Sequence, residues 1–504
     1  MDINKYTRWL PDRVASAAFR CFKRLPGMKK VINAEYDAIL NQIEEKIKPY
    51  KGTHATYTEL PEQGRASDDI IAEMKQIRAL EMGKWKEGFV SGAVYHGDTD
   101  HIDLLNKAYA LNSQSNPLHL DVWPSAAKYE AEIVSMTAKM LGAEHVADKD
   151  HPQSDVCGVV SSGGTESILL AMKTYRDWAR DKRGIKNPEI IAPSSVHVAF
   201  DKAAHYFNIK ITHVPVGGDY RADVEKTKEL INRNTIALIG SAPCFPYGVI
   251  DPIRALSELA HERGIGFHTD ACLGGFVLPW TGQLGYQIPP FDFSLPGVTS
   301  ISADTHKYGY AAKGTSVVLY RTQELRRYQY FTTAEWSGGL YFSPTFAGSR
   351  AGGLSAACWA SMVATGREGY LDATNKILET AAWIKAGIEE IPDIQILGDP
   401  LWVIAFASKT LDIYRVLDCM TEKGWSLNGL HKPPCVHLCV TLRHTQADIA
   451  QRFLDDLAAA VETVKETPQS EGGMAPVYGM AATMPDRGAV SELLARYMDM
   501  IFKV

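Results

Sequence analysis

Three residues with reactive side chains stand at or just after the ends of apolar runs of strand length: His197, Asp270 and Lys307. A charged group buried at the end of a strand needs a partner of opposite charge, hydrogen-bond donors or a covalent use. Lysine is a side chain with which proteins form Schiff bases. A lone histidine is more often structural, so the pattern gains its meaning from the three residues together, which indicate a site for chemistry.

A glycine-rich turn adds a second feature of this kind. Residues 161–167 read SSGGTES and lie between an apolar run and a helical run. Gly163 and Gly164 allow a phosphate to approach backbone amides at a helix N-terminus, where the helix dipole favours an anion, and Thr165 adds a hydroxyl donor. Because such turns are also common for structural reasons, this one indicates a phosphate site only in combination with other residues.

Apolar runs that alternate with helix-length segments must position these groups. The runs lack polar alternation, which is typical of strands buried on both faces of a sheet. We therefore expect an α/β fold with a mostly parallel sheet in a large domain. Further apolar runs after a long helical stretch predict a smaller α+β domain at the C-terminal end. The runs are 156–160, 189–192, 209–214, 235–240, 266–270, 300–303 and 316–320 for the large sheet, and 394–397, 402–407 and 436–442 for the small one.

The glycine turn, His197, Asp270 and Lys307 follow four predicted strands in that order. Open α/β sheets bind ligands at the carboxyl ends of their strands, so we expect these groups to converge. Pyridoxal 5'-phosphate requires this equipment: a dipole for its phosphate, a flat group over its ring, a carboxylate for its pyridine nitrogen and a lysine. The sequence therefore predicts this cofactor. We expect an N-terminal helical arm over residues 1–115, a large cofactor-binding α/β domain over 116–353 and a small α+β domain over 354–504.

Composition excludes several other classes of protein. The chain has 504 residues and a formal net charge of -6, without a long basic run, so nucleic acid is not an expected partner. Eight cysteines without CxxC pairs argue against a metal site. We expect a cytoplasmic protein, because no apolar run approaches the roughly 18 residues that span a bilayer and no signal peptide is visible. The first thirty residues predict a basic amphipathic helix, which packs either on a partner subunit or on an anionic membrane surface.

Longer motifs connect these features to a known family. The sequence resembles the group II decarboxylase-like enzymes of pyridoxal phosphate fold type I, which is aspartate aminotransferase-like, and more narrowly the sphingosine-1-phosphate lyases of the bacterial type. One departure is Tyr247, where many relatives have histidine, and it affects one local contact. The motifs are VSGAVYHG (90–97), NPLHLDVWP (116–124), SAPCFPYGVIDP (241–252), SADTHKYGYAAKG (302–314), SPTFAGSRAG (343–352) and VYGMA (477–481).

The resemblance implies roles for individual residues at the cofactor. Lys307 would form the Schiff base, Asp270 would pair with the pyridine nitrogen and His197 would stack on the ring. The resemblance also implies a homodimer with shared active sites, because the AGSR segment reaches the cofactor of the other subunit in the related lyases. The remaining residues that would contact the cofactor are Gly163, Gly164, Thr165 and His306 at the phosphate, Gly348 and Ser349 from the other subunit, and Asn116 and His119 in the pocket wall.

The same resemblance implies a substrate site and a reaction. Tyr95, Asn116, His119, Lys313, Arg350 and Tyr478 would bind the substrate, and Lys313 and Tyr478 would join Lys307, Asp270 and His197 in catalysis. Taken alone, the two tyrosines are also consistent with packing, Lys313 with a solvated lysine, and Arg350 with a cap or an ion pair within the dimer interface.

The expected reaction is retro-aldol cleavage of a phosphorylated sphingoid base, sphingosine-1-phosphate or its dihydro form, into a long-chain aldehyde and phosphoethanolamine. Lys307, Lys313 or a tyrosine is the expected proton carrier, and the sequence does not choose among them. The alternative function is an amino acid decarboxylase for glutamate or an aromatic amino acid, which would share the cofactor residues. A catalytically idle relative would lack Lys307 or Asp270, and both are present.

Overall fold

The computed structural model describes residues 26–146, 155–467 and 487–504. Contacts divide the chain into two units. The larger comprises Lys84–Leu430 and Cys435–Pro468, and the smaller comprises Met1–Gly83, His431–Pro434 and Gln469–Val504. This division follows contacts rather than the expected domain boundaries near residues 115 and 353, and those boundaries stay a prediction.

A seven-stranded sheet forms the centre of the larger unit, in the order β1-β7-β6-β5-β4-β2-β3. Only β7 runs antiparallel to its neighbours, so the predicted mostly parallel sheet is confirmed. Every residue of β2, β4, β5, β6 and β7 is buried, which explains why these segments lack polar alternation in the sequence. The strands are β1 (Cys157–Ser161), β2 (Glu189–Pro193), β3 (Lys210–Val214), β4 (Thr235–Ser241), β5 (Gly266–Asp270), β6 (Ser300–Ala303) and β7 (Ser316–Tyr320).

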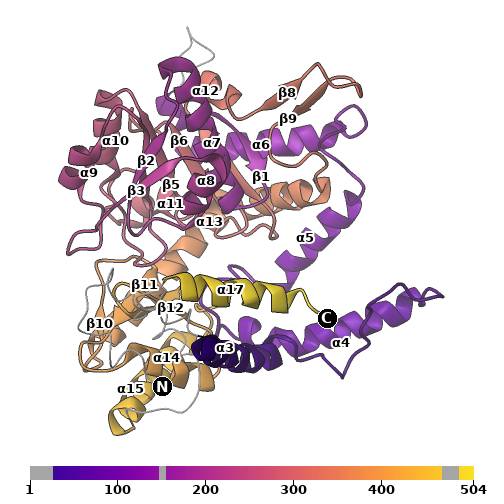
Figure 1. Ribbon diagram of the computed structural model, residues 1–504, viewed down its shortest axis with the longest axis vertical. Coiled ribbons are helices and arrows are strands. Elements are labelled where there is room, and N and C mark those ends of the chain that lie inside the picture. The colour runs from indigo at the N-terminus through magenta and orange to yellow at the C-terminus, as the bar shows by residue number, and fades with distance from the viewer. Residues whose placement is uncertain (1–25, 147–154, 468–486) are drawn as a thin grey trace. The chain divides into compact units, whose positions relative to one another are not determined.

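Helices surround this sheet and bury its faces (Figure 1). Helix α7 contacts five of the strands, and its Tyr175 is fully buried in the main hydrophobic core, where the hydroxyl donates to the carbonyl of Phe267 at 3.0 Å. The helices of this part of the chain are α5 (Thr99–Leu111), which packs on the long helix α13 (Gly352–Glu389) and not on the sheet, α6 (Pro124–Met140), α7 (Gly164–Arg183), α8 (Ala199–Phe207), α9 (Val224–Leu230), α10 (Ile253–Glu262), α11 (Leu278–Thr281) and α12 (Gln323–Arg327), with short 3-10 turns η1 (Ala143–His145) and η3 (Gly282–Leu284).

A long helix, α13 (Gly352–Glu389), connects the large sheet to a second sheet in the same unit, and its backbone is kinked at Gly366. This second sheet is antiparallel, in the order β10-β11-β13-β12, and two helices pack beside it, so the predicted small α+β region is confirmed. A separate hairpin consists of β8 (Phe331–Thr333) and β9 (Tyr341–Ser343). The remaining elements are β10 (Gln395–Ile396), β11 (Val403–Ala407), β12 (Asn428–Leu430), β13 (Cys435–Cys439), α14 (Ile413–Glu422) and α15 (Ile449–Glu466).

The smaller unit is helical in the part that the structure describes. Helices α3 (Pro26–Ile47) and α17 (Arg487–Ile501) pack through Tyr36, Leu40 and Leu493. Most of α4 (Ser67–Lys86) also belongs to this unit, and no residue of that helix is buried. The expected amphipathic helix over the first thirty residues lies almost entirely outside the described residues. Among the helices described, none combines the length and the apolar character needed to cross a membrane.

Candidate active site

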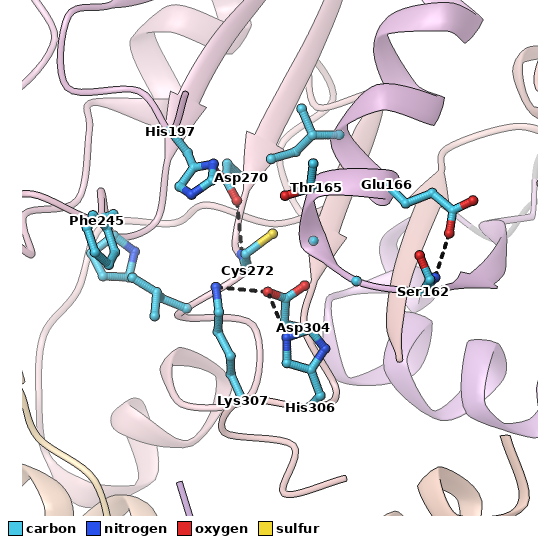
Figure 2. Close-up of a pocket in the computed structure, with 15 residues that line it drawn as sticks. Ser162, Thr165, Glu166, His197, Phe245, Asp270, Cys272, Asp304, His306 and Lys307 are labelled. Carbon is cyan, nitrogen blue, oxygen red and sulfur yellow. Dashed lines mark hydrogen bonds and ion pairs between the residues drawn. The ribbon is translucent and has the colours of Figure 1, made fainter. Parts of the chain in front are cut away.

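A cavity of about 400 Å³ lies at the carboxyl ends of the central strands (Figure 2). Parallel strands end at the same edge of a sheet, and that geometry brings together groups that are far apart in the sequence. The residues that line the cavity are Ser162, Gly163, Gly164, Thr165, Glu166, Ile168, His197, Pro243, Phe245, Asp270, Cys272, Leu273, Asp304, His306 and Lys307. The glycine turn, His197, Asp270, His306 and Lys307 are thus placed together, as predicted.

The glycine turn joins β1 to α7, which begins at Gly164. A Cβ atom on Gly164 would lie 2.6 Å from Oδ1 of Asp304 and 2.8 Å from Sγ of Cys272, so only glycine fits there without displacing a neighbour. Glu166 closes the turn by accepting a hydrogen bond from the backbone N–H of Ser162 at 2.6 Å. The first amides of α7 therefore border the cavity, where a helix N-terminus favours a phosphate.

Lys307 forms an ion pair with Asp304, with 2.8 Å between Nζ and Oδ2 (Figure 2). Burial is the largest effect and lowers the pKa of Lys307, but the charge and hydrogen bond of Asp304, together with Cys272 and Tyr95, raise that pKa by more, and the net pKa lies above its ordinary value. Burial likewise opposes the charge of Asp304, whereas Lys307 and His306 favour it, so the pKa of Asp304 is lowered. Asp304 therefore holds the lysine amine at the cavity in its protonated form.

Asp270 ends β5 and is almost fully buried. One of its oxygens accepts hydrogen bonds from the backbone N–H of Cys272 at 3.1 Å and from the hydroxyl of Ser302 at 3.3 Å. These bonds fix the carboxylate at the cavity wall. His197 lies beside it, and its Nδ1 accepts the backbone N–H of Ala199 at 3.2 Å, which sets the orientation of the ring (Figure 2).

A second lysine lies next to this group without lining the cavity. Lys313 donates from Nζ to the carbonyl of His306 at 3.1 Å and stands 4.5 Å from the centroid of the Tyr95 ring. Burial, together with the positive charge of Lys307, lowers the pKa of Lys313 to about 8. Tyr95 is buried against Tyr308, and burial raises the pKa of the Tyr95 hydroxyl, which therefore stays neutral. Of Lys313 and Tyr95, only Lys313 therefore changes charge near neutral pH.

The predicted residues from the AGSR and NPLH motifs form a separate group that does not line the cavity. Asn116 donates from Nδ2 to the hydroxyl of Ser349 at 3.0 Å and accepts the backbone N–H of Arg350 at 3.2 Å. Arg350 binds Glu130 of the same chain through both guanidinium ends, at 2.7 and 2.8 Å. His119 lies against Trp123 in the same region.

The other residues singled out from the sequence do not line the cavity or lie outside the described residues. Gly348 precedes Ser349, and a Cβ atom on Gly348 would lie 3.2 Å from the hydroxyl of Tyr341. Tyr478 and the loop around it lie outside the described residues. Tyr247, the departure from many relatives, is buried against Tyr220, 4.8 Å between ring centroids, and does not line the cavity.

Sequence reasoning missed Asp304, and assigned no role to Cys272, Ser302 or Phe245 at the site. Asp304 stands three residues before Lys307 in the SADTHK segment. Opposite charges at that spacing are a usable signal for a contact. Cys272 is buried, and burial raises the pKa of its thiol, so the interpretation of this residue as a small apolar side chain agrees with its surroundings. Within the described ranges, His, Cys, Asp and Glu side chains form no group of three that could hold a metal.

The fold and the cavity together define the class of protein. An imidazole, a carboxylate at a strand end, a helix N-terminus lined by glycines and a lysine surround one cavity of a mostly parallel sheet. The glycine turn leaves room for the cofactor phosphate, and the donor set matches the demands of pyridoxal phosphate. The protein is thus a pyridoxal phosphate-dependent enzyme of the α/β class.

Comparisons with known proteins agree with this class and narrow it. Residues 49–407 match the model of the pyridoxal-dependent decarboxylase conserved domain. The chain is 48% identical over 492 residues to a sphingosine-1-phosphate lyase of Arabidopsis thaliana, covering 95% of this chain and 87% of that protein. A solved sphingosine-1-phosphate lyase from Burkholderia pseudomallei is 42% identical, with a TM-score of 0.84 over 90% of this chain and 99% of that chain.

A more distant neighbour shares the fold alone. The glutamate decarboxylase of Lactobacillus brevis superposes with a TM-score of 0.69 at 19% identity, over 82% of this chain and 97% of that chain. The chain belongs to the pyridoxal-dependent decarboxylase family and, within it, to the sphingosine-1-phosphate lyases. Its cofactor is accordingly pyridoxal phosphate, and it is a lyase.

Proposed function

We propose that this protein cleaves sphingosine-1-phosphate, or its dihydro form, into a long-chain aldehyde and phosphoethanolamine. The observation that carries the proposal is Lys313, a second lysine beside Lys307 with a pKa near 8. Cleavage of a bond next to a hydroxyl-bearing carbon requires a base for the hydroxyl proton, whereas decarboxylation does not. The relatives named sphingosine-1-phosphate lyases support the same reaction.

The bound cofactor supplies an electron sink for the pair released when the bond between the amine-bearing and hydroxyl-bearing carbons breaks. Asp270 is placed to hold a proton at the pyridine nitrogen, since its carboxylate ends β5 at the cavity. His197, which lines the cavity, would cover the cofactor ring, and the amides at the start of α7 would hold the phosphate together with Thr165 and His306. Lys307 would hold the cofactor, and its amine lies 2.8 Å from Oδ2 of Asp304.

Two proton movements complete the reaction. The hydroxyl proton leaves as the aldehyde forms, and one proton is added to the amine-bearing carbon, which gives phosphoethanolamine. We assign the first movement to Nζ of Lys313, because its neutral form is populated near neutral pH. The second belongs to the ammonium of Lys307, which Asp304 keeps protonated. Tyr95 and Tyr478 stay proposed neighbours of the substrate phosphate and hydroxyl.

We further propose a homodimer whose active sites are shared. Asn116 and Ser349 are joined to each other but do not line the cavity, which is the arrangement expected of residues that serve the other subunit. The adjoining β8–β9 hairpin region is rich in exposed aromatic side chains, and a patch of that kind favours a protein partner. Its exposed members are Phe331, Trp336, Phe342 and Phe346.

Location and membrane contact stay proposals from the sequence. We propose a cytoplasmic enzyme of the bacterial type, with no nucleic acid partner, in agreement with the formal net charge of -6. The amphipathic segment over the first thirty residues is proposed to meet either the partner subunit or an anionic lipid surface.

A product assay tests the proposed reaction. The full chain, loaded with pyridoxal phosphate, is incubated with sphingosine-1-phosphate and, separately, with glutamate and the aromatic amino acids, and products are identified by mass spectrometry. We expect a long-chain aldehyde and phosphoethanolamine from the first incubation only, with neither product from the Lys307→Ala variant. Amines formed from free amino acids, without aldehyde, would assign the protein to the decarboxylases.

A further inference from the structure

A second cavity, of about 460 Å³, lies in the larger unit and shares no lining residue with the cofactor cavity. The cavity is formed by the loop before α5 with the first turn of that helix, by Tyr310 after β6, by the part of α13 around and after the kink at Gly366, and by the residues that follow β13. No step of the proposed reaction uses this cavity. Its lining contains two histidines, an arginine, a lysine and two carboxylates.

The two histidines are stacked. The rings of His96 and His101 lie 4.1 Å apart at 15°. His96 Nδ1 accepts the backbone N–H of Asp98 at 3.3 Å, so the proton of the neutral ring is on Nε2. His101 donates from Nε2 to the carbonyl of Tyr310 at 2.8 Å. Among the described residues, Nε2–H of His96 has no acceptor, which leaves one donor of the stack available to a ligand.

Arg443 provides a second available donor group. Within the described parts of the chain its guanidinium donates no hydrogen bond, and its Nε is fully buried. The aliphatic part of the Arg443 side chain is packed tightly, because a Cβ atom on Gly97 would lie 2.7 Å from Cδ of Arg443. A buried donor of a charged group without an acceptor is costly, and an oxyanion removes that cost.

The other charges at this cavity are matched within the protein. Asp98 accepts the backbone N–H groups of Asp100 and His101 at the start of α5, and these bonds lower its pKa. Lys376 and Asp372 pair with each other at 2.7 Å on exposed α13. The hydroxyl of Tyr310 stays neutral, because burial raises its pKa. Arg443 is therefore the charge for which the described residues provide no hydrogen-bonding partner.

We propose that this cavity binds a phosphate group, inorganic or carried by a small monoester, with Arg443 and His96 as its donors. Arginine binds phosphate oxygens in pairs, and a neutral imidazole N–H adds a further donor. The cavity is also larger than a bare carboxylate needs. It borders the catalytic segment, since the backbone N–H of Tyr310 donates to the carbonyl of Lys307 at 3.0 Å. The site is independent of the proposed reaction.

Binding of an anion in this cavity should change the protonation of His96. Burial, His101 and Arg443 lower the pKa of His96 to about 4, against an opposing effect of Asp98, so His96 is neutral at pH 6.5. A phosphate beside Nε2 stabilises the protonated ring and raises that pKa. Proton exchange with the buffer during binding therefore differs between the wild-type chain and a variant without His96.

Calorimetry on the cofactor-loaded full chain tests the proposal. Inorganic phosphate and glycerol phosphate are titrated at pH 6.5 into the wild type, Arg443→Gln, His96→Gln and the control Arg452→Gln, in two buffers of different ionisation enthalpy. Arg452 is a matched control because its guanidinium lies outside the cavity, over the Phe89 ring at 4.7 Å. Phosphate binding at the cofactor cavity is common to all four proteins and cancels in the comparison.

We expect both cavity variants to lose one phosphate site or to bind there at least about tenfold more weakly, while Arg452→Gln matches the wild type. Proton exchange should change in His96→Gln, a smaller substitution that guards against a folding defect in Arg443→Gln. Tighter binding of inorganic phosphate would identify the ligand as free phosphate, and tighter binding of glycerol phosphate would identify it as a phosphate monoester. Equal site number, affinity and proton exchange in all four proteins would overturn the proposal, whatever the outcome of the product assay.

Discussion

Replacement of Gly164 by alanine tests whether the glycine turn and Asp304 form one close-fitting wall of the cofactor site. The added Cβ atom would lie 2.6 Å from Oδ1 of Asp304 and 2.8 Å from Sγ of Cys272. Non-bonded carbon contacts are favourable at about 3.5–4.0 Å, so Asp304 must move by about 1 Å. Asp304 is buried and paired with Lys307 at 2.8 Å, and such a movement weakens that pair.

The cost falls mainly on the cofactor-loaded protein. Without cofactor, the Asp304 carboxylate can shift into the adjoining cavity, whereas bound cofactor occupies that room. Overpacking of this kind costs about 1–3 kcal/mol. At about 1.4 kcal/mol per tenfold change, the affinity for pyridoxal phosphate should fall by roughly 5- to 150-fold.

Gly282 provides the matched control. It has a helical φ of -60°, and a Cβ atom there would meet nothing within 4 Å. Cofactor dissociation constants, measured by absorbance on the two alanine variants and the wild type, should be raised only for Gly164→Ala. An unchanged constant for Gly164→Ala would refute the claim that Asp304 and the turn are held in fixed contact.

Three further predictions concern the lysines and one half-buried ion pair. Lys307→Ala should lose the cofactor absorbance band at about 420 nm and keep its circular dichroism spectrum, whereas the control Lys202→Ala should keep both. A band that persists in Lys307→Ala would show that Lys307 is not the lysine that binds the cofactor. The wild-type kcat/KM should rise with pH through about 8, because the neutral amine of Lys313 is the active form. The Lys313→Arg variant should lose this rise. A fall of kcat/KM over the same pH range would make Lys313 an acid or a phosphate ligand. Glu130→Gln should lower the free energy of unfolding, measured in urea, by about 1.5–3 kcal/mol, since it breaks the bidentate pair with Arg350. Glu324→Gln removes one partner of an exposed ion pair and should change the free energy of unfolding by less than about 1 kcal/mol. Equal effects of the two substitutions would contradict the claim that burial strengthens the pair of Glu130 with Arg350.

The large sheet was predictable because its strands are buried on both faces. All seven predicted runs coincide with β1 to β7 to within one residue at each end. The reversed direction of β7 was not predictable, since an antiparallel strand buried on both faces has the same apolar pattern as a parallel one. The association of α3 with α17 was also beyond the sequence, because their contact joins the two ends of the chain.

The candidate site was predictable where chemistry depends on residue type and strand position. Gly164, His197, Asp270 and Lys307 converge because each follows a strand of one sheet. The ion pair between Asp304 and Lys307 depends on burial and side-chain direction, which a sequence does not display. The lowered pKa of Lys313 has the same origin, since burial is its largest cause.

The central claim is that this chain breaks a carbon–carbon bond and then places a solvent-derived hydrogen on the amine-bearing carbon. Cleavage of sphingosine-1-phosphate by the cofactor-loaded enzyme in deuterated water tests it most directly, with mass spectrometry of both products. The account predicts a long-chain aldehyde together with phosphoethanolamine that carries one deuterium on the carbon next to nitrogen. Phosphoethanolamine without deuterium, or the absence of both products, would contradict it.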